Sequence, residues 1–170
     1  MDIITHYTLT FVLYSFIGYL CEVAYCSIGQ GHLVNRGFLY GPWLPIYGFG
    51  GLIVDIFLVP IAHYPIIVFI TAIILTSIVE YIGSWGLEKI FSIKLWDYSA
   101  HRFNINGRVC LLNSSLFGLM SMVLVYGAYP WIQKLFAIIP NMLAERLADL
   151  LRILFAVDLT LSVLKMSAFK

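Results

Sequence analysis

Residues 66–87 of the chain read IIVFITAIILTSIVEYIGSWGL, an apolar run with one charged residue, Glu80. About 20 apolar residues in a helix cross the hydrocarbon core of a bilayer, so this run predicts a transmembrane helix. The whole chain has the same character, because 61% of its 170 residues are hydrophobic and 11% are charged. Soluble domains carry about 25% charged residues. The sequence therefore predicts an all-α integral membrane protein.

Four further apolar runs of similar length each predict a helix, and they cover residues 7–28, 43–63, 109–129 and 147–166. With 66–87, they give a polytopic protein of about five transmembrane helices in a single membrane domain, residues 1–170. We see no removable signal peptide at the N-terminus and expect the first helix to direct insertion.

The distribution of lysine and arginine predicts the orientation, since cytoplasmic loops are enriched in both. With five spans, seven of these residues fall on one side of the membrane: Arg36, Lys89, Lys94, Arg102, Arg108, Lys165 and Lys170. Three fall on the other side: Lys134, Arg146 and Arg152. The N-terminus is therefore expected outside and the C-terminus in the cytoplasm of a multi-pass plasma-membrane protein.

Residues 41–51, GPWLPIYGFGG, contain two prolines and four glycines, which do not favour a regular helix. Irregular backbone at membrane depth is tolerated only against protein or a wet cavity. We interpret this stretch as a broken or re-entrant segment before the second helix. A tight packing corner between helices is the alternative.

Three acidic residues lie inside apolar runs: Glu22, Glu80 and Asp158. A charge at the bilayer centre costs roughly 3 kcal/mol or more, so such residues usually pair or function. Each lies six to eight residues before the cytoplasmic end of its predicted helix, or roughly 10 Å inside that end at the rise of an α-helix. We expect the three carboxylates at one level of the membrane.

Arginines from the cytoplasmic loops are suitable partners for these acids, because the guanidinium group holds a carboxylate or phosphate through two hydrogen bonds. We expect the loop between the predicted helices 66–87 and 109–129 to be an ordered lid over the pocket. A passive connector is the alternative. The predicted binding pocket comprises Glu22, Asn35, Arg36, Glu80, Asp97, Arg102, Asn104, Arg108 and Asp158. Structural ion pairs that tie loops to helices are the alternative interpretation.

Asp55 and Arg152 have similar predicted depths near the outer surface and are expected to form a structural pair. Snorkelling of Arg152 to the surface is the alternative.

Several kinds of site and partner are not expected. The four histidines have no metal-ligand spacing, so no metal site is predicted. Residues 41–51 lack the Gly-Lys-Ser/Thr ending of a nucleotide-binding loop, and no cofactor is expected. The net charge of +1 does not indicate binding to nucleic acid.

Four motifs resemble a bacterial family of small polytopic proteins catalogued as type IV ABC-transporter permeases: NRGFLYGP (35–42), PIYGFG (45–50), WDYS (96–99) and FNINGR (103–108). The resemblance includes Gly18 and Glu22 and covers roughly residues 14–130. It implies transport coupled to an ATPase on a separate polypeptide that docks on the cytoplasmic loops. It also implies a homo-oligomer or a larger complex, because five helices are few for a complete pathway.

The sequence thus favours a membrane transport subunit that moves a small polar or amphiphilic solute through a cytoplasm-facing polar pocket. An intramembrane enzyme acting on a lipid head group is a second hypothesis, with Glu22 or Glu80 as general base. It is disfavoured because no metal motif or evident nucleophile is present. A non-catalytic membrane scaffold is the third.

Overall fold

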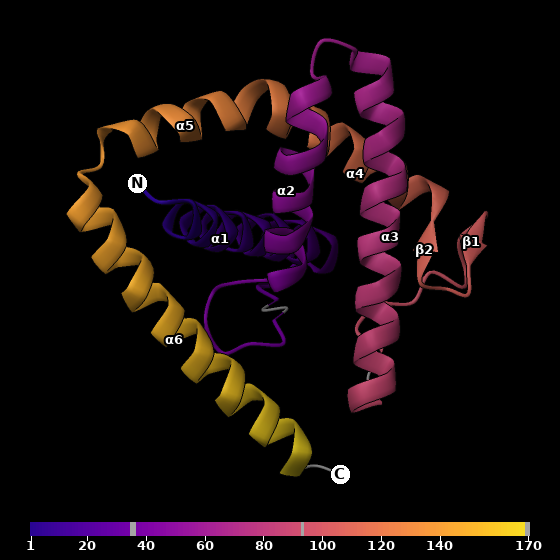
Figure 1. Cartoon of the computed structure of the whole chain (residues 1–170). Helices are drawn as coiled ribbons and strands as arrows, with labels where there is room; N and C mark the ends of the chain where they lie inside the picture. Colours follow the sequence, from indigo (N-terminus) through magenta and orange to yellow (C-terminus); the bar gives the residue numbers. More distant parts are fainter. Residues whose placement is uncertain (35–36, 93, 169–170) are drawn as a thin grey trace. The chain divides into compact units, whose positions relative to one another are not determined.

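The computed structural model describes residues 1–34, 37–92 and 94–168, and these residues are mostly helical (Figure 1). The helices are α1 (Ile3–Gln30), α2 (Pro45–Leu58), η1 (Val59–Ile61), α3 (Pro65–Phe91), α4 (Leu111–Val123), η2 (Leu124–Ala128), α5 (Tyr129–Ile138) and α6 (Asn141–Ala168). Two short strands, β1 (Asn104–Ile105) and β2 (Val109–Cys110), form an antiparallel hairpin between α3 and α4.

Within the described residues, three helices are long and apolar enough to cross a membrane: Ile3–Gln30, Pro65–Phe91 and the continuous stretch Leu111–Ile138. A helix of 28 residues is about 42 Å long, which exceeds the roughly 30 Å hydrocarbon core. A fourth apolar helix, Pro45–Ile61, is shorter. The prediction of a helical membrane protein is confirmed.

Local chemistry fixes the ends of α1. The Asp2 carboxylate precedes the helix and accepts hydrogen bonds from the N–H groups of Ile4 and Thr5, both at 2.9 Å. Such an N-cap satisfies donors that have no partner within the helix. At the other end Gly31 has φ 69° and its N–H donates to the Ser27 carbonyl, as in a glycine C-cap.

The fourth helix, predicted over residues 109–129, does not end at Tyr129 but continues through Pro130 to Ile138. The five residues before Tyr129 form a π-helix, η2, in which each turn is wider than in an α-helix. Proline lacks an N–H and its ring clashes with the carbonyl four residues earlier. A wider turn removes that conflict, so the helix passes through Pro130 without ending.

The described chain consists of two compact units. The α1–α6 unit contains residues 1–49 and 137–170, and the α3–α4 unit contains residues 50–136. In the α1–α6 unit, the first turn of α2 packs closely on α1. A Cβ at Gly18 would overlap the Tyr47 side chain, and a Cβ at Gly48 would overlap Ser15. Glycine at both positions is therefore needed for this approach.

In the α3–α4 unit, helix α3 packs along α4. A core cluster lies among the apolar side chains of Val54, Leu58, Val68, Ala72 and Val125. The hairpin is ordered by its turn, where Asn106 and Gly107 have φ of 53° and 66°. The Asn-Gly pair favours this left-handed backbone, so residues 104–110 form a folded hairpin.

Candidate functional site

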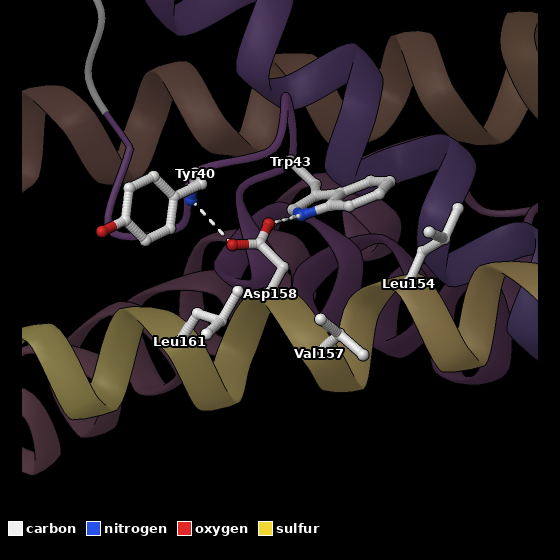
Figure 2. A pocket seen from close by; sticks show the side chains of 6 residues that line it. All are labelled: Tyr40, Trp43, Leu154, Val157, Asp158 and Leu161. Atoms are coloured by element: carbon white, nitrogen blue, oxygen red, sulfur yellow. Dashed lines mark hydrogen bonds between the residues drawn. The ribbon is translucent and has the colours of Figure 1, made fainter.

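The Asp158 carboxylate on α6 is surrounded by neutral hydrogen-bond donors (Figure 2). One oxygen accepts from the backbone N–H of Tyr40 at 2.8 Å and from the Ser162 hydroxyl at 3.2 Å. The other accepts from the backbone N–H of Gly41 at 2.7 Å and from the indole N–H of Trp43 at 2.6 Å. Asp158 is 9% exposed, and no ion pair involves it among the described residues.

The irregular stretch before α2 supplies three of these donors. Residues 38–42 form bends and α2 does not begin until Pro45, so the N–H groups of Tyr40 and Gly41 are not committed to a helix. Gly41 also makes room for the acid, because a Cβ there would lie 2.7 Å from the Asp158 oxygen and 2.5 Å from the Trp43 ring. The irregular backbone of this stretch therefore leaves N–H groups that bind the Asp158 carboxylate.

A pocket of about 420 Å³ opens beside this acid. Its lining residues are Tyr40, Trp43, Leu154, Val157, Asp158 and Leu161, as Figure 2 shows. This volume lies within the range of roughly 300–1,000 Å³ that is typical of ligand sites. The Lys165 ammonium stands 4.8 Å from the centre of the Tyr40 ring, in a cation–π contact.

Glu22 on α1 is half-buried and also meets an aromatic donor. The Tyr47 hydroxyl donates to its carboxylate at 2.8 Å, and the Cys26 thiol lies 3.6 Å from the other oxygen. Because Tyr47 rests against Gly18, the close approach of α2 to α1 positions this hydroxyl.

Glu80 on α3 is 5% exposed and follows the same pattern. The Tyr98 hydroxyl donates to its carboxylate at 2.9 Å. Burial raises the pKa of Tyr98 above its ordinary value, and the negative charge of Glu80 raises it further. Tyr98 therefore stays a protonated donor to this acid at neutral pH.

Arg108 pairs with Glu88 at the cytoplasmic end predicted for α3. The guanidinium lies 2.5 Å from the Glu88 carboxylate and 5.7 Å from the centre of the Tyr81 ring. Trp85, Glu88, Lys89 and Arg108 line a second pocket of about 290 Å³.

The other loop residues of the predicted pocket shape the loop itself. Asp97 pairs with Lys94 at 2.8 Å and accepts from the N–H and hydroxyl of Ser99. The contact with Lys94 has the largest effect and those with Ser99 the next largest, and together they hold the pKa of Asp97 below its ordinary value. Asn104 accepts from the N–H of Gly107 and donates to the backbone, while Arg102 is exposed.

The predicted site residues are thus distributed over the two units. Glu22 and Asp158 lie in the α1–α6 unit, and Glu80, Asp97, Arg102, Asn104 and Arg108 lie in the α3–α4 unit. Asn35 and Arg36 lie outside the described residues. The single binding pocket that the sequence analysis expects for all these residues therefore stays a prediction.

The pairing of Asp55 with Arg152 also stays a prediction, since the two residues belong to different units. Arg152 lies 2.7 Å from Asp149 and donates to the Thr8 hydroxyl at 3.0 Å.

Sequence reasoning did not identify the three aromatic donors, Trp43, Tyr47 and Tyr98, because it sought positive charges for the buried acids. A signal was present, since Trp43 directly follows the motif NRGFLYGP, Tyr47 lies in PIYGFG and Tyr98 lies in WDYS. Buried tyrosine and tryptophan need a partner for their polar atom, and a carboxylate at membrane depth is such a partner.

The family described as "Putative ABC-transporter type IV" matches residues 9–163 of the chain. Comparisons with the curated proteins and with the solved structures gave no match. The family match covers most of the chain and includes Asp158, so the chain belongs to this family. Membership supports a transporter-like role in a membrane.

Proposed function

We propose that this member of the type IV ABC-transporter family is a membrane transport subunit for a small polar or amphiphilic solute. The observation that carries this proposal is the Asp158 site, where a broken helix start meets a buried carboxylate beside a 420 Å³ pocket. Transporters commonly bind substrate where irregular backbone exposes polar groups at membrane depth.

The proposed topology has five spans: α1, α2 with η1, α3, the continuous α4–η2–α5 helix, and α6. With seven lysines and arginines on one side and three on the other, the N-terminus lies outside and the C-terminus in the cytoplasm. The protein is then a multi-pass plasma-membrane protein whose pocket opens to the cytoplasm. Labelling of single introduced cysteines from each side of intact cells tests this orientation.

The proposed pocket also brings Glu22 and Glu80 to the level of Asp158, with Asn35, Arg36, Asp97, Arg102, Asn104 and Arg108 contributed by the cytoplasmic loops. An aromatic donor already accompanies each acid. Neutral donors stabilise a carboxylate without cancelling its charge, which keeps the acid able to attract a solute.

The proposed assembly includes a separate ATPase subunit, because the sequence contains no nucleotide-binding loop of the Walker type. It also includes a second copy of the chain. Native mass spectrometry of gently extracted protein would report both partners by their masses.

A transport assay tests the function directly. The extracted protein with its bound partners is placed in vesicles loaded with a metabolite extract, and solutes that leave the vesicles on addition of ATP are identified by mass spectrometry. At least one polar or amphiphilic solute should leave with the wild type and not with Glu22→Gln. That variant should still fold, because its amide oxygen can accept from the Tyr47 hydroxyl.

The same assay separates the other hypotheses. If no solute leaves, the transport proposal is wrong. If Glu22→Gln and Glu80→Gln both unfold before transport can be measured, the acids are structural, as in a scaffold. If a lipid in the extract is chemically converted by the protein in detergent, the protein is an enzyme.

A further inference from the structure

We propose that the Asp158 pocket binds a lipophilic quaternary ammonium cation, with its head group against Tyr40 and Trp43 and its alkyl chain along α6. This inference rests on the proposed function, since it names the chemical class of the amphiphilic solute. It concerns only residues of the α1–α6 unit.

The first argument is charge. The two Asp158 oxygens accept four hydrogen bonds, two each, and every donor is neutral. A carboxylate has about four acceptor sites, so this arrangement suits the ionised form and leaves no position for a carboxyl proton. Among the described residues no ion pair offsets this charge. A negative charge that is hydrogen-bonded but not neutralised attracts a cation.

The second argument is the kind of cation. A primary ammonium carries three N–H donors, and each needs an acceptor when it is buried. The Asp158 oxygens cannot provide these acceptors, because they are already occupied. A quaternary ammonium has no N–H group and requires only a negative field and aromatic faces, for which it has high affinity.

The third argument is the lining of the pocket. Tyr40 and Trp43 provide aromatic rings on either side of the Asp158 carboxylate (Figure 2). The Lys165 ammonium over the Tyr40 ring already uses this face as a cation site. Lys165 is exposed, so its flexible side chain can leave the ring when a ligand arrives.

The fourth argument is the apolar surface that continues from the acid. Leu154, Val157 and Leu161 line the same pocket at spacings of three and four residues along α6, and each is about half exposed. Side chains at these spacings form one stripe on a helix. An alkyl chain attached to the cation has a matching surface there.

Binding of radiolabelled dodecyltrimethylammonium to the purified full-length chain in a nonionic detergent tests the proposal. The competitors all carry a decyl chain and differ from one another only in the head group: decyltrimethylammonium, decylammonium and decanol. The quaternary competitor should displace the probe at about tenfold lower concentration than either of the others. If decylammonium or decanol competes equally well, the proposal is wrong.

Substitution of Tyr40 localises the binding. Tyr40→Leu should weaken binding of the probe about tenfold, whereas Tyr40→Phe, which keeps the ring, should change it less than twofold. Tyr40 is 61% exposed and contacts Asp158 through its backbone N–H, so both variants should fold. If a folded Tyr40→Leu protein binds the probe with the same affinity as the wild type, the proposed binding site is wrong. If that variant does not fold, the competitor ranking on the wild type decides.

Lys165 provides a test of whether a cation binds at the Tyr40 ring. Lys165→Gln removes the competing ammonium and should tighten binding about threefold, whereas Lys165→Arg should not. Equal or weaker binding of the probe to Lys165→Gln would show that the ammonium and the probe do not compete for the Tyr40 ring, and it would overturn the proposal. Because the assay needs neither ATP nor a partner subunit, binding without transport would contradict only the proposed function, and transport without binding only this inference.

Discussion

Asp158 in the α1–α6 unit accepts four hydrogen bonds from neutral groups, whereas Glu88 in the α3–α4 unit pairs with the guanidinium of Arg108 at 2.5 Å. Asp158 is 9% exposed, while the Glu88 side chain is 46% exposed. The protein therefore has two ways to hold an acid. Glu88 is neutralised by a neighbour, and Asp158 is stabilised but keeps its charge.

The two arrangements differ in how strongly they depend on their surroundings. In the Arg108–Glu88 pair the carboxylate is nearly half exposed, so water solvates it and the pair contributes little energy. A buried carboxylate held by fixed dipoles has no such compensation from water, so its site is sensitive to any change of shape or charge. We expect the two regions to respond to substitution with different magnitudes.

Removal of the Asp158 carboxylate should have the largest effect. Asp158→Ala leaves the donors of Tyr40, Gly41 and Trp43 without their acceptor, and the expected loss is about 3–5 kcal/mol of unfolding free energy. Reversible unfolding in mixed detergent micelles measures it. Asp149→Ala is the matched control on the same helix, because Asp149 is exposed and should cost less than about 1 kcal/mol. Equal losses in the two variants would remove the distinction.

Enlargement of Gly41 should have the next largest effect. The new Cβ of Gly41→Ala would lie 2.5 Å from the Trp43 ring and 2.7 Å from Asp158, so these groups must move. We expect a loss of about 1–3 kcal/mol in the same unfolding assay. Gly29→Ala is the control, since no atom lies within 4 Å of its new Cβ and a helical alanine should gain about 0.5–1 kcal/mol. A neutral Gly41→Ala would contradict the geometry of the site.

Neutralisation of the Arg108–Glu88 pair should have a smaller effect. Glu88→Gln is expected to cost about 0.5–1 kcal/mol, because Glu88 is nearly half exposed. A double-mutant cycle with Arg108→Gln should give a coupling energy of similar size that falls as salt increases. A coupling above about 3 kcal/mol would place this pair in the same class as the Asp158 site.

The smallest effect is expected at Asp97, which is exposed and pairs with Lys94. Because the folded-state pKa of Asp97 is lowered from 3.8, its contribution to stability is complete above that pH and is lost as the pH falls through the folded value. The difference in melting temperature between the wild type and Asp97→Asn should therefore be constant from pH 7 to pH 5 and shrink below about pH 4. A difference that grows in acid would contradict the assigned contacts.

The sequence allowed the helical membrane fold and the irregular stretch before α2 to be predicted. Periodicity and composition report directly on burial in lipid, which explains this success. The partners of the acids could not be predicted in the same way. Trp43 and Asp158 are separated by 115 positions, and only tertiary packing brings them together.

A second difference concerns the fourth helix, which was predicted to end at residue 129 but continues through Pro130. In the interior of an α-helix, the proline ring clashes with the carbonyl four residues earlier and kinks or breaks the helix. Here the π-helix η2 accommodates it, and neither hydropathy nor propensity indicates a wide turn in advance.

The wide turn at Leu124–Ala128 changes which side chains share a face of the long helix. A π-turn contains one residue more than an α-turn, so side chains beyond it are rotated by roughly 100° relative to an uninterrupted α-helix. A single helical wheel drawn over residues 111–138 would therefore assign Ile132 and Phe136, both buried, to the wrong face. Deletion of one residue from this turn would restore uniform winding and carry those two side chains away from their present neighbours.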